Sequence, residues 1–396
     1  MAEFDYSKGA GLSGDYQLNI DQKYYNSLYI EGFSQMMSSP SYCYKFYWLE
    51  AIVTLISMDV TETTMNDIID EMICNAWYSV CEFHIHLTRL KKNNDVDDGL
   101  ERAINTLKMY SDLSSQASKD EIKAVIKKYD DKLKDNKKQL TAEVPYRALS
   151  AFFESDNPIK SDMSINRKIS YIKMVNKNKK LLPYTIGESN ALKREIIFNK
   201  EWIRMIQDNT VSILGWIQYE KVKWLQRNNP EVPGLIYKLK PLDKNIRNLE
   251  KVKVLWKEVL KIEPMIDIFT DISMTEEKYD IDHFIPKSFV VNDELWNLMP
   301  VDSSLNSSKN NKLPEWDKYF IKFAKNQYKL YNQITNKEKI KELYIDCFKD
   351  NLYSIWAVNE LYKEGNGEEK FYRILEENMY PVYKSARRQG YTVWYW

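Results

Sequence analysis

An aspartate and a histidine, Asp282 and His283, adjoin each other in a polar stretch that runs from residue 279 to 314. A neutral imidazole can take a proton from water near pH 7. A carboxylate oxygen suits Mg²⁺, which keeps several of its waters and so needs few protein ligands. Hydrolysis of a phosphodiester requires an activated water and a cation on the phosphoryl and leaving oxygens. The pair therefore indicates metal-assisted hydrolysis, although alone it also fits a polar surface hairpin.

Further polar residues follow at set distances. Asn297 stands fourteen residues after His283, Asn306 nine after Asn297, and Lys309 three after Asn306. On a helix, Asn306, Lys309 and Asn310 lie at i, i+3 and i+4 and therefore share one face. The side-chain carbonyl of Asn306 would offer a second oxygen ligand to the same ion.

The local pattern predicts a strand, a loop, a second strand and a helix around one ion. Residues 279–284 favour a strand that stops at Pro286, and residues 289–291 favour the start of a return strand. Asp302 or Ser303 would cap the helix that carries the second asparagine.

This stretch resembles the HNH nuclease motif, also called the ββα-metal or His-Me finger. The resemblance implies that His283 is the general base and that Asp282 and Asn306 bind Mg²⁺ or Mn²⁺. It implies that Asn297 holds the connecting loop and helps to fix the imidazole. We also predict a nucleic-acid contact for Lys309. The spacing is similar to that in the HNH domain of RNA-guided CRISPR effectors.

Segments outside the motif, among them YKFYWLEAI and LQRNNPEVPGLIYKL, are similar to bacterial HNH proteins with a helical N-terminal region. That resemblance implies a setting in mobile elements and anti-phage defence. Lys287 stands where that group has a tryptophan, a difference that concerns local packing rather than the chemistry.

The composition predicts a mainly α protein, and the resemblance implies a small ββα-metal HNH nuclease module (α+β) in its C-terminal half. The chain has 396 residues, 44% of them apolar and 13% aromatic, and has 11 glycines. We expect a helical N-terminal domain over 1–155 that regulates or binds a partner. A basic helical region over 156–261 and the nuclease module with C-terminal helices over 262–396 would follow.

Two segments outside the motif have patterns that predict helices. Residues 118–140 are highly charged with sparse apolar positions and predict one exposed helix. Residues 199–226 predict one long helix, whose tryptophans fit a core position. The basic residues interleaved with those tryptophans also fit phosphate contact and base stacking.

The net charge is zero, but the charges are unevenly distributed. Residues 1–110 carry 8 lysines and arginines against 16 acidic residues, and residues 160–261 carry 22 against 10. The acidic part disfavours DNA and suits a protein partner or self-association. The basic part predicts a nucleic-acid surface leading to the motif. Its proposed contacts are Lys221, Lys223, Arg227, Lys238 and Lys240.

The cysteines, the other two histidines and the most apolar run bear on the cellular compartment and on metal binding. The four cysteines form no CxxC pair and fit reduced thiols in a cytoplasmic protein without structural zinc. His84 and His86 would point to different faces of a helix and fit core positions better than metal ligands. We expect no signal peptide and no membrane segment, because the most apolar run, 46–57, is short and contains Glu50.

These patterns favour a metal-dependent HNH endonuclease acting on DNA. An RNA endonuclease is one alternative. The other is a nucleic-acid-binding or partner-recognition subunit whose module is structural or dormant. The presence of Asp282, His283 and Asn306 together argues against dormancy.

Overall fold

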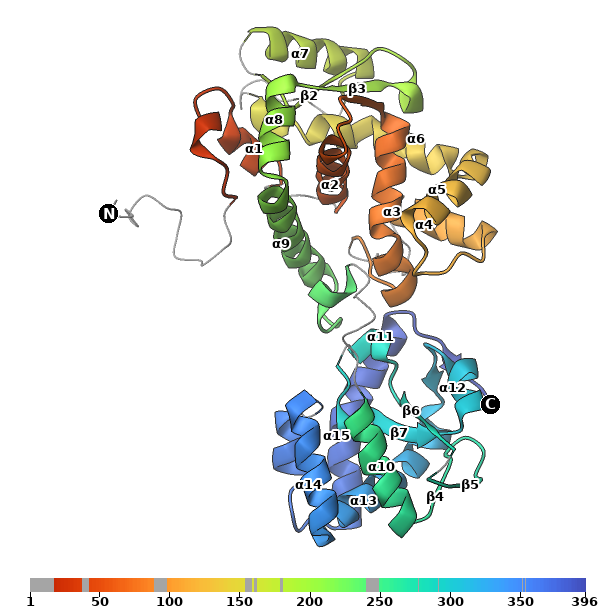
Figure 1. Ribbon diagram of the computed structural model, residues 1–396. Helices are drawn as coiled ribbons and strands as arrows, with labels where there is room; N and C mark the ends of the chain where they lie inside the picture. Colours follow the sequence, from red (N-terminus) through yellow and green to blue (C-terminus); the bar gives the residue numbers. More distant parts are fainter. Residues whose placement is uncertain are drawn as a thin grey trace, which may run out of the picture. The chain divides into compact units, whose positions relative to one another are not determined.

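The chain forms two compact units, one of residues 1–81 with 86–229 and the other of residues 82–85 with 230–396. The structure, a computed structural model, describes residues 18–37, 43–88, 98–153, 159, 162–178, 181–239, 249–276, 278–290, 292–350, 352 and 354–396. For residues 178, 306, 307 and 350 the description covers the backbone alone. Figure 1 shows the elements of both units along the chain.

The first unit is helical. Its helices are α1 (Ile30–Gln35), α2 (Tyr44–Ser57), α3 (Met65–Phe83), α4 (Gly99–Tyr110), α5 (Lys119–Lys128), α6 (Asp130–Arg147), α7 (Ile165–Asn178), α8 (Lys200–Asp208) and α9 (Thr210–Asn228). The last two residues of α3 are counted with the second unit. Trp48 of α2, Trp77 of α3 and Trp202 of α8 are almost fully buried in its core.

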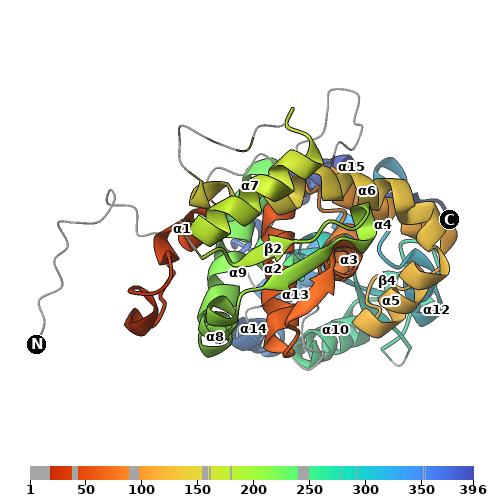
Figure 2. The ribbon, with the colours of Figure 1, turned by 90° about the horizontal axis from the view of Figure 1, so that it is seen from above.

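A small antiparallel sheet, which the sequence patterns did not predict, joins distant parts of the first unit. Its strands, in the spatial order β1-β3-β2, are β1 (Glu62–Thr64), β2 (Tyr184–Ile186) and β3 (Glu195–Phe198). Helix α7 packs against β2, as Figures 1 and 2 show.

Two helices predicted as continuous are each broken by one residue. The expected helix over 118–140 divides at Tyr129 into α5 and α6, and Ser118 begins α5 with a capping box that includes Glu121. The expected helix over 199–226 divides at Asn209 into α8 and α9. The Asn209 side chain donates to the Met205 carbonyl at 2.8 Å, which ends α8 locally.

The second unit surrounds a few short strands with longer helices. The helices are α10 (Glu250–Ile262), α11 (Lys287–Val290), α12 (Ser303–Lys309), α13 (Trp316–Asn336), α14 (Glu338–Cys347) and α15 (Glu368–Arg388). The strands are β4 (Met265–Ile266), β5 (Ser273–Met274), β6 (Asp280–His283), β7 (Leu298–Val301), β8 (Leu313–Pro314) and β9 (Val393–Trp394). The pairs β4–β5 and β6–β7 are antiparallel, and β8–β9 is parallel.

One hydrophobic core fixes the strand pair β6–β7 to the helices of the second unit. Trp256 of α10, Leu298 of β7 and Phe323 of α13 belong to it and are fully buried. Phe284, the residue after β6, lies with its ring centroid 4.7 Å from that of Phe323. The end of β6 is therefore anchored on α13.

The predicted fold class, mainly α with a small α+β module in the C-terminal half, is confirmed. The three-domain division at 1–155, 156–261 and 262–396 assigns roles as well as boundaries and stays a prediction. Among the described helices, none combines the length and the apolar character that crossing a membrane requires.

Candidate active site

The candidate site begins at the pair of strands that carries Asp282 and His283. In the antiparallel register, Asp282 lies opposite Met299 and His283 opposite Leu298. The return strand is therefore β7, and the predicted start of that strand at residues 289–291 is wrong. Residues 287–290 form α11 instead, and the amide of Phe289 donates to the carbonyl of Pro286 at 2.9 Å. Proline has a φ value suited to starting a helical turn, which explains the change.

Lys309 ties α12 to the end of β6. Its ammonium donates to Oδ2 of Asp282 at 2.9 Å and to the carbonyl oxygen of His283 at 2.7 Å. The Lys309 side chain is 1% exposed and that of Asp282 is 13% exposed. Lys309 was predicted to contact nucleic acid, but in this arrangement its charge is buried against Asp282. It holds the carboxylate in place instead of presenting its ammonium on the surface.

Asn297 closes the loop between β6 and β7. Its Oδ1 accepts from the amide of Ile285 at 2.8 Å, and its Nδ2 donates to the carbonyl of Ile285 at 2.8 Å. The amide of Phe284 also donates to the carbonyl of Asn297 at 2.9 Å. Asn297 is fully buried, so these bonds hold the two ends of the loop together without competition from water. The contacts are those of a residue that holds the loop, and its effect on the imidazole stays a prediction.

An acidic residue that the sequence patterns did not single out lies beside the histidine. Oδ1 of Asp293 is 2.9 Å from Nε2 of His283, and Oδ2 of Asp293 is 3.0 Å from the ammonium of Lys287. Burial raises the pKa of Asp293, but the His283 imidazole and the Lys287 ammonium outweigh burial and lower this pKa to about 2. Lys287, at a position where the sequence resemblance implies a tryptophan, thus has a charge partner.

Helix α12 carries the predicted metal ligand Asn306. Asp302 caps it, since Oδ1 of Asp302 accepts from the amide of Ser304 at 2.9 Å, as the sequence predicted. The buried Asp267, which sequence reasoning missed, accepts from the amide of Asp302 at 2.8 Å and steadies the same end. The Asn306 side chain lies outside the described residues, so its role as a ligand stays a prediction.

Asn310 does not extend the face that α12 presents. The helix ends at Lys309, and Asn310 has a φ of 46° in the left-handed region, which asparagine tolerates better than most residues. The prediction that Asn310 shares a helix face with Asn306 and Lys309 is therefore wrong.

The predicted nucleic-acid contacts differ in exposure. The ammonium of Lys221 is buried and lies 2.7 Å from Oε2 of Glu50, so in this arrangement it is not available to a phosphate. Lys223 is partly exposed, and its ammonium is 3.5 Å from Oε1 of Glu220. Arg227 is exposed.

Two residues further along the chain, Lys238 and Lys240, were also predicted to contact nucleic acid. Lys238 is buried and donates to the carbonyl of Phe289 at 2.5 Å, and burial lowers the pKa of Lys238 to about 7. Lys240 lies outside the described residues.

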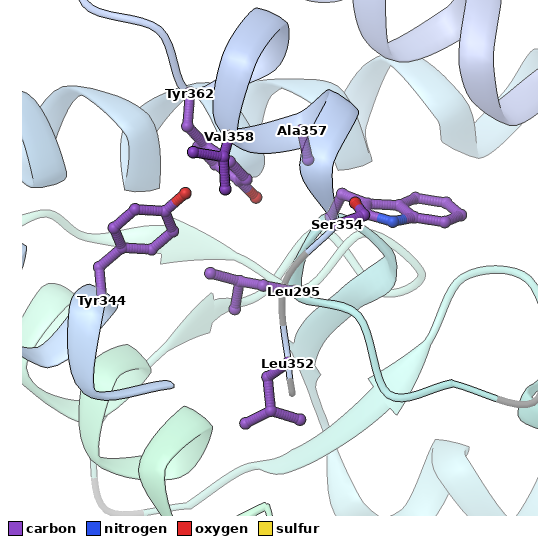
Figure 3. A pocket seen from close by; sticks show the side chains of 8 residues that line it. Leu295, Tyr344, Leu352, Ser354, Ala357, Val358 and Tyr362 are labelled. Carbon is purple, nitrogen blue, oxygen red and sulfur yellow. The ribbon is translucent and has the colours of Figure 1, made fainter. Parts of the chain in front are cut away.

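His84, His86 and a small pocket are not part of the candidate site. Nδ1 of His86 is 2.9 Å from Oε1 of Glu101, and the ring of His84 packs edge-on against that of Tyr391. These contacts suit partly buried histidines. The pocket in Figure 3 is mainly apolar, with Leu295, Leu352 and Val358 among its lining residues, and offers little to a charged substrate.

Among the described residues, no group of three His, Cys, Asp or Glu side chains could hold a metal ion together. A hydrated Mg²⁺ needs fewer protein ligands than that. Asp282 fits such an ion, because its carboxylate is part-exposed and Lys309 occupies only Oδ2. Within the described part of the chain, no protein donor takes Oδ1.

The family comparison agrees with this geometry. Residues 268–315, which include β5, β6, α11, β7 and α12, match the family model described as HNH endonuclease. No curated protein and no solved structure matches the chain. Residues 268–315 therefore form a module that matches the HNH endonuclease family.

Proposed function

We propose that this protein is a metal-dependent endonuclease that hydrolyses phosphodiester bonds of DNA. The observation that supports this proposal best is the anchoring of the Asp282-His283 pair. Lys309 of α12 holds both residues, and Asn297 closes the loop that follows them. The family match supports nuclease activity in general. DNA as the substrate, the metal and a role in anti-phage defence rest on the sequence resemblance and the basic region.

In this proposal His283 accepts the proton of the attacking water. The imidazole side chain is 3% exposed, so bulk water competes little with the reacting water for its nitrogens. Its backbone is held on its C-terminal side, because its carbonyl accepts from Lys309 and the next residue packs on Phe323. A base held in this way loses little orientation on substrate binding.

Asp282 would hold the divalent ion through Oδ1, with the Asn306 carbonyl as the second protein ligand. When bound, Mg²⁺ or Mn²⁺ would supply positive charge for the phosphoryl and leaving oxygens. Lys309 keeps the carboxylate in one orientation through Oδ2 at 2.9 Å. A carboxylate bound on one oxygen is oriented before the ion arrives, as residues around metal ligands commonly ensure.

A cleavage assay with purified protein tests the proposal. Supercoiled plasmid, single-stranded DNA and RNA are incubated with Mg²⁺, with Mn²⁺ and with EDTA. We expect nicking or cleavage of DNA that depends on the ion and is lost in EDTA. Cleavage of RNA in preference to both DNA forms would identify an RNA endonuclease. Binding of nucleic acid without cleavage under any ion would favour the binding subunit with a dormant module.

A further inference from the structure

The geometry points to Asp293 as a residue that positions the general base, an inference that rests on the proposed nuclease function. Asp293 lies in the loop between β6 and β7, ten residues after His283. Its carboxylate nevertheless returns to the imidazole, with Oδ1 in ion-pair contact 2.9 Å from Nε2, although these two buried atoms are not aligned as a hydrogen bond. The Asp293 side chain is 14% exposed and that of His283 is 3% exposed, so the pair is largely sheltered from water.

The loop fixes Asp293 from both sides. Asn297, four residues later, bonds twice to Ile285 and closes the loop. Lys287, on α11 of the same loop, lies 3.0 Å from Oδ2 of Asp293. An ammonium can donate hydrogen bonds but cannot accept them. Lys287 therefore keeps an oxygen atom of the side chain at position 293 turned toward its Nζ. The other oxygen is left facing the imidazole.

A carboxylate at Nε2 decides which nitrogen carries the proton. A carboxylate is an acceptor, so the neutral imidazole places its N–H at Nε2 and its lone pair at Nδ1. In serine proteases an aspartate that orients a histidine has the same effect on the tautomer. Asp293 would therefore assign Nδ1 as the atom that takes the proton from water, while Nε2–H stays on Asp293. Asp293 touches neither substrate nor ion in this account.

The amide variant gives the sharpest test because Lys287 constrains it. In Asp293→Asn the amide oxygen should turn to the Lys287 ammonium, and the NH₂ group should then face Nε2. That arrangement makes Nε2 an acceptor and moves the ring proton to Nδ1. Asp293→Asn should thus be at least as damaging as Asp293→Ala. In the double variant Lys287→Met with Asp293→Asn, the amide is free to turn its oxygen to Nε2, and activity should partly return.

The tautomer can be read directly by nitrogen NMR of the ring. The chain has three histidines, so a sample with ¹⁵N-labelled histidine gives few ring signals, and a His283→Gln sample assigns them. At a pH where the ring is neutral, we expect the Nε2–H tautomer in the native protein. We expect the Nδ1–H tautomer in Asp293→Asn and a return toward Nε2–H in the double variant. The Nδ1–H tautomer in the native protein, or the same tautomer in all samples, would overturn the inference.

Kinetics separate this inference from the proposed function. For Asp293→Ala and Asp293→Asn, kcat should fall about 10-fold or more, bounded by the 10²–10⁴-fold that a general base contributes, with KM nearly unchanged. Lys287→Met alone, which leaves the carboxylate at Nε2, is the control and should stay within about 3-fold. If the native protein cleaves and both Asp293 variants cleave at the same rate or faster, the positioning role is rejected and the proposed function stands. Native protein without cleavage would reject the proposed function, and the NMR result would still decide the pairing.

Thermal unfolding of each sample shows whether it folds. If Asp293→Ala is unfolded, Asp293→Asn carries the test, since it keeps the shape of the side chain. Loss of activity in the Asn variant without recovery in the double variant would indicate a structural role and contradict the inference.

Discussion

At the scale of single residues, the basic side chains show how differently a positive charge is used in this chain. Lys309 is buried against Asp282, and Lys221 is buried against Glu50, 171 residues away. Arg227, by contrast, is exposed. Sequence reasoning placed all three on a nucleic-acid surface, because a basic residue normally keeps its charge in water. A buried lysine is recognised through its partner, and a distant partner leaves no local pattern.

Lys309 gives a prediction about stability. Lys309→Ala leaves the largely buried Asp282 carboxylate without its partner, and breaking a buried pair typically costs 3–5 kcal/mol. Because Asp282 is 13% exposed, we expect a loss of about 3 kcal/mol in the free energy of unfolding of the second unit. Urea denaturation measures it, and the exposed Lys312→Ala serves as the control, with a change within about 0.5 kcal/mol. Equal and small changes in both variants would contradict the anchoring role.

The positions of the site residues were largely predictable from spacing, but their contacts were not. Asp282 and His283 stand where the motif requires them, at the end of a predicted strand that the structure contains as β6. Asp293 and Lys287 had no such signal. Their contact with each other and with the imidazole depends on the path of an irregular loop, which follows no period.

At the scale of elements, helical patterns were easier to recognise in the sequence than helix breaks and short strands. In α10, Val252, Leu255, Trp256 and Val259 recur at helical spacing and are all buried. The breaks at Tyr129 and Asn209 were missed, since hydrophobic periodicity continues across each of them. Strands β1, β2 and β3 have three or four residues each, and their pairing over long sequence distances stabilises them more than their local pattern.

Replacing Asn297 tests how the loop between β6 and β7 is held. Asn297→Ala removes both hydrogen bonds to Ile285 and leaves buried backbone groups without partners, which should cost about 1–3 kcal/mol. Cleavage should fall less than in a variant without the base, because packing on Phe284 still holds part of the loop. Hydrogen exchange of residues 284–297 and the cleavage rate measure the two effects. Asn292→Ala, an exposed asparagine of the same loop, should change neither; a loop that stays protected in Asn297→Ala would argue against this account.

At the scale of the whole molecule, the uneven charge remains the main guide to partners. Residues 160–261 carry 22 basic against 10 acidic residues, and residues 1–110 carry 8 against 16. The burial of Lys221 and Lys238 removes two charges from the predicted nucleic-acid surface. The acidic part as a site for a protein partner or a second copy stays a prediction, and DNA crosslinks within residues 1–110 would contradict it.

Arg227 should account for part of the salt dependence of DNA binding. Log K for duplex DNA falls with log salt by about 0.9 per phosphate contact. Replacing Arg227 by alanine should lower that slope by about 1, because one contact is lost. Fluorescence anisotropy with a labelled duplex at several salt concentrations measures the slope. Lys127→Ala, which alters an exposed lysine outside the basic region, is the control; identical slopes for both variants would remove Arg227 from the interface.

We propose that His283 acts as the base in a metal-dependent nuclease, and a comparison of histidine variants tests this role. Cleavage of plasmid DNA in Mg²⁺ is measured for the native protein and for His283→Ala, with His84→Asn as a histidine control. Asparagine suits the positive φ of 54° at position 84. We predict a fall of about 10²–10⁴-fold for His283→Ala at unchanged folding and DNA binding, without rescue by added metal, and near-native cleavage for His84→Asn. Native rates in folded His283→Ala would contradict the mechanism.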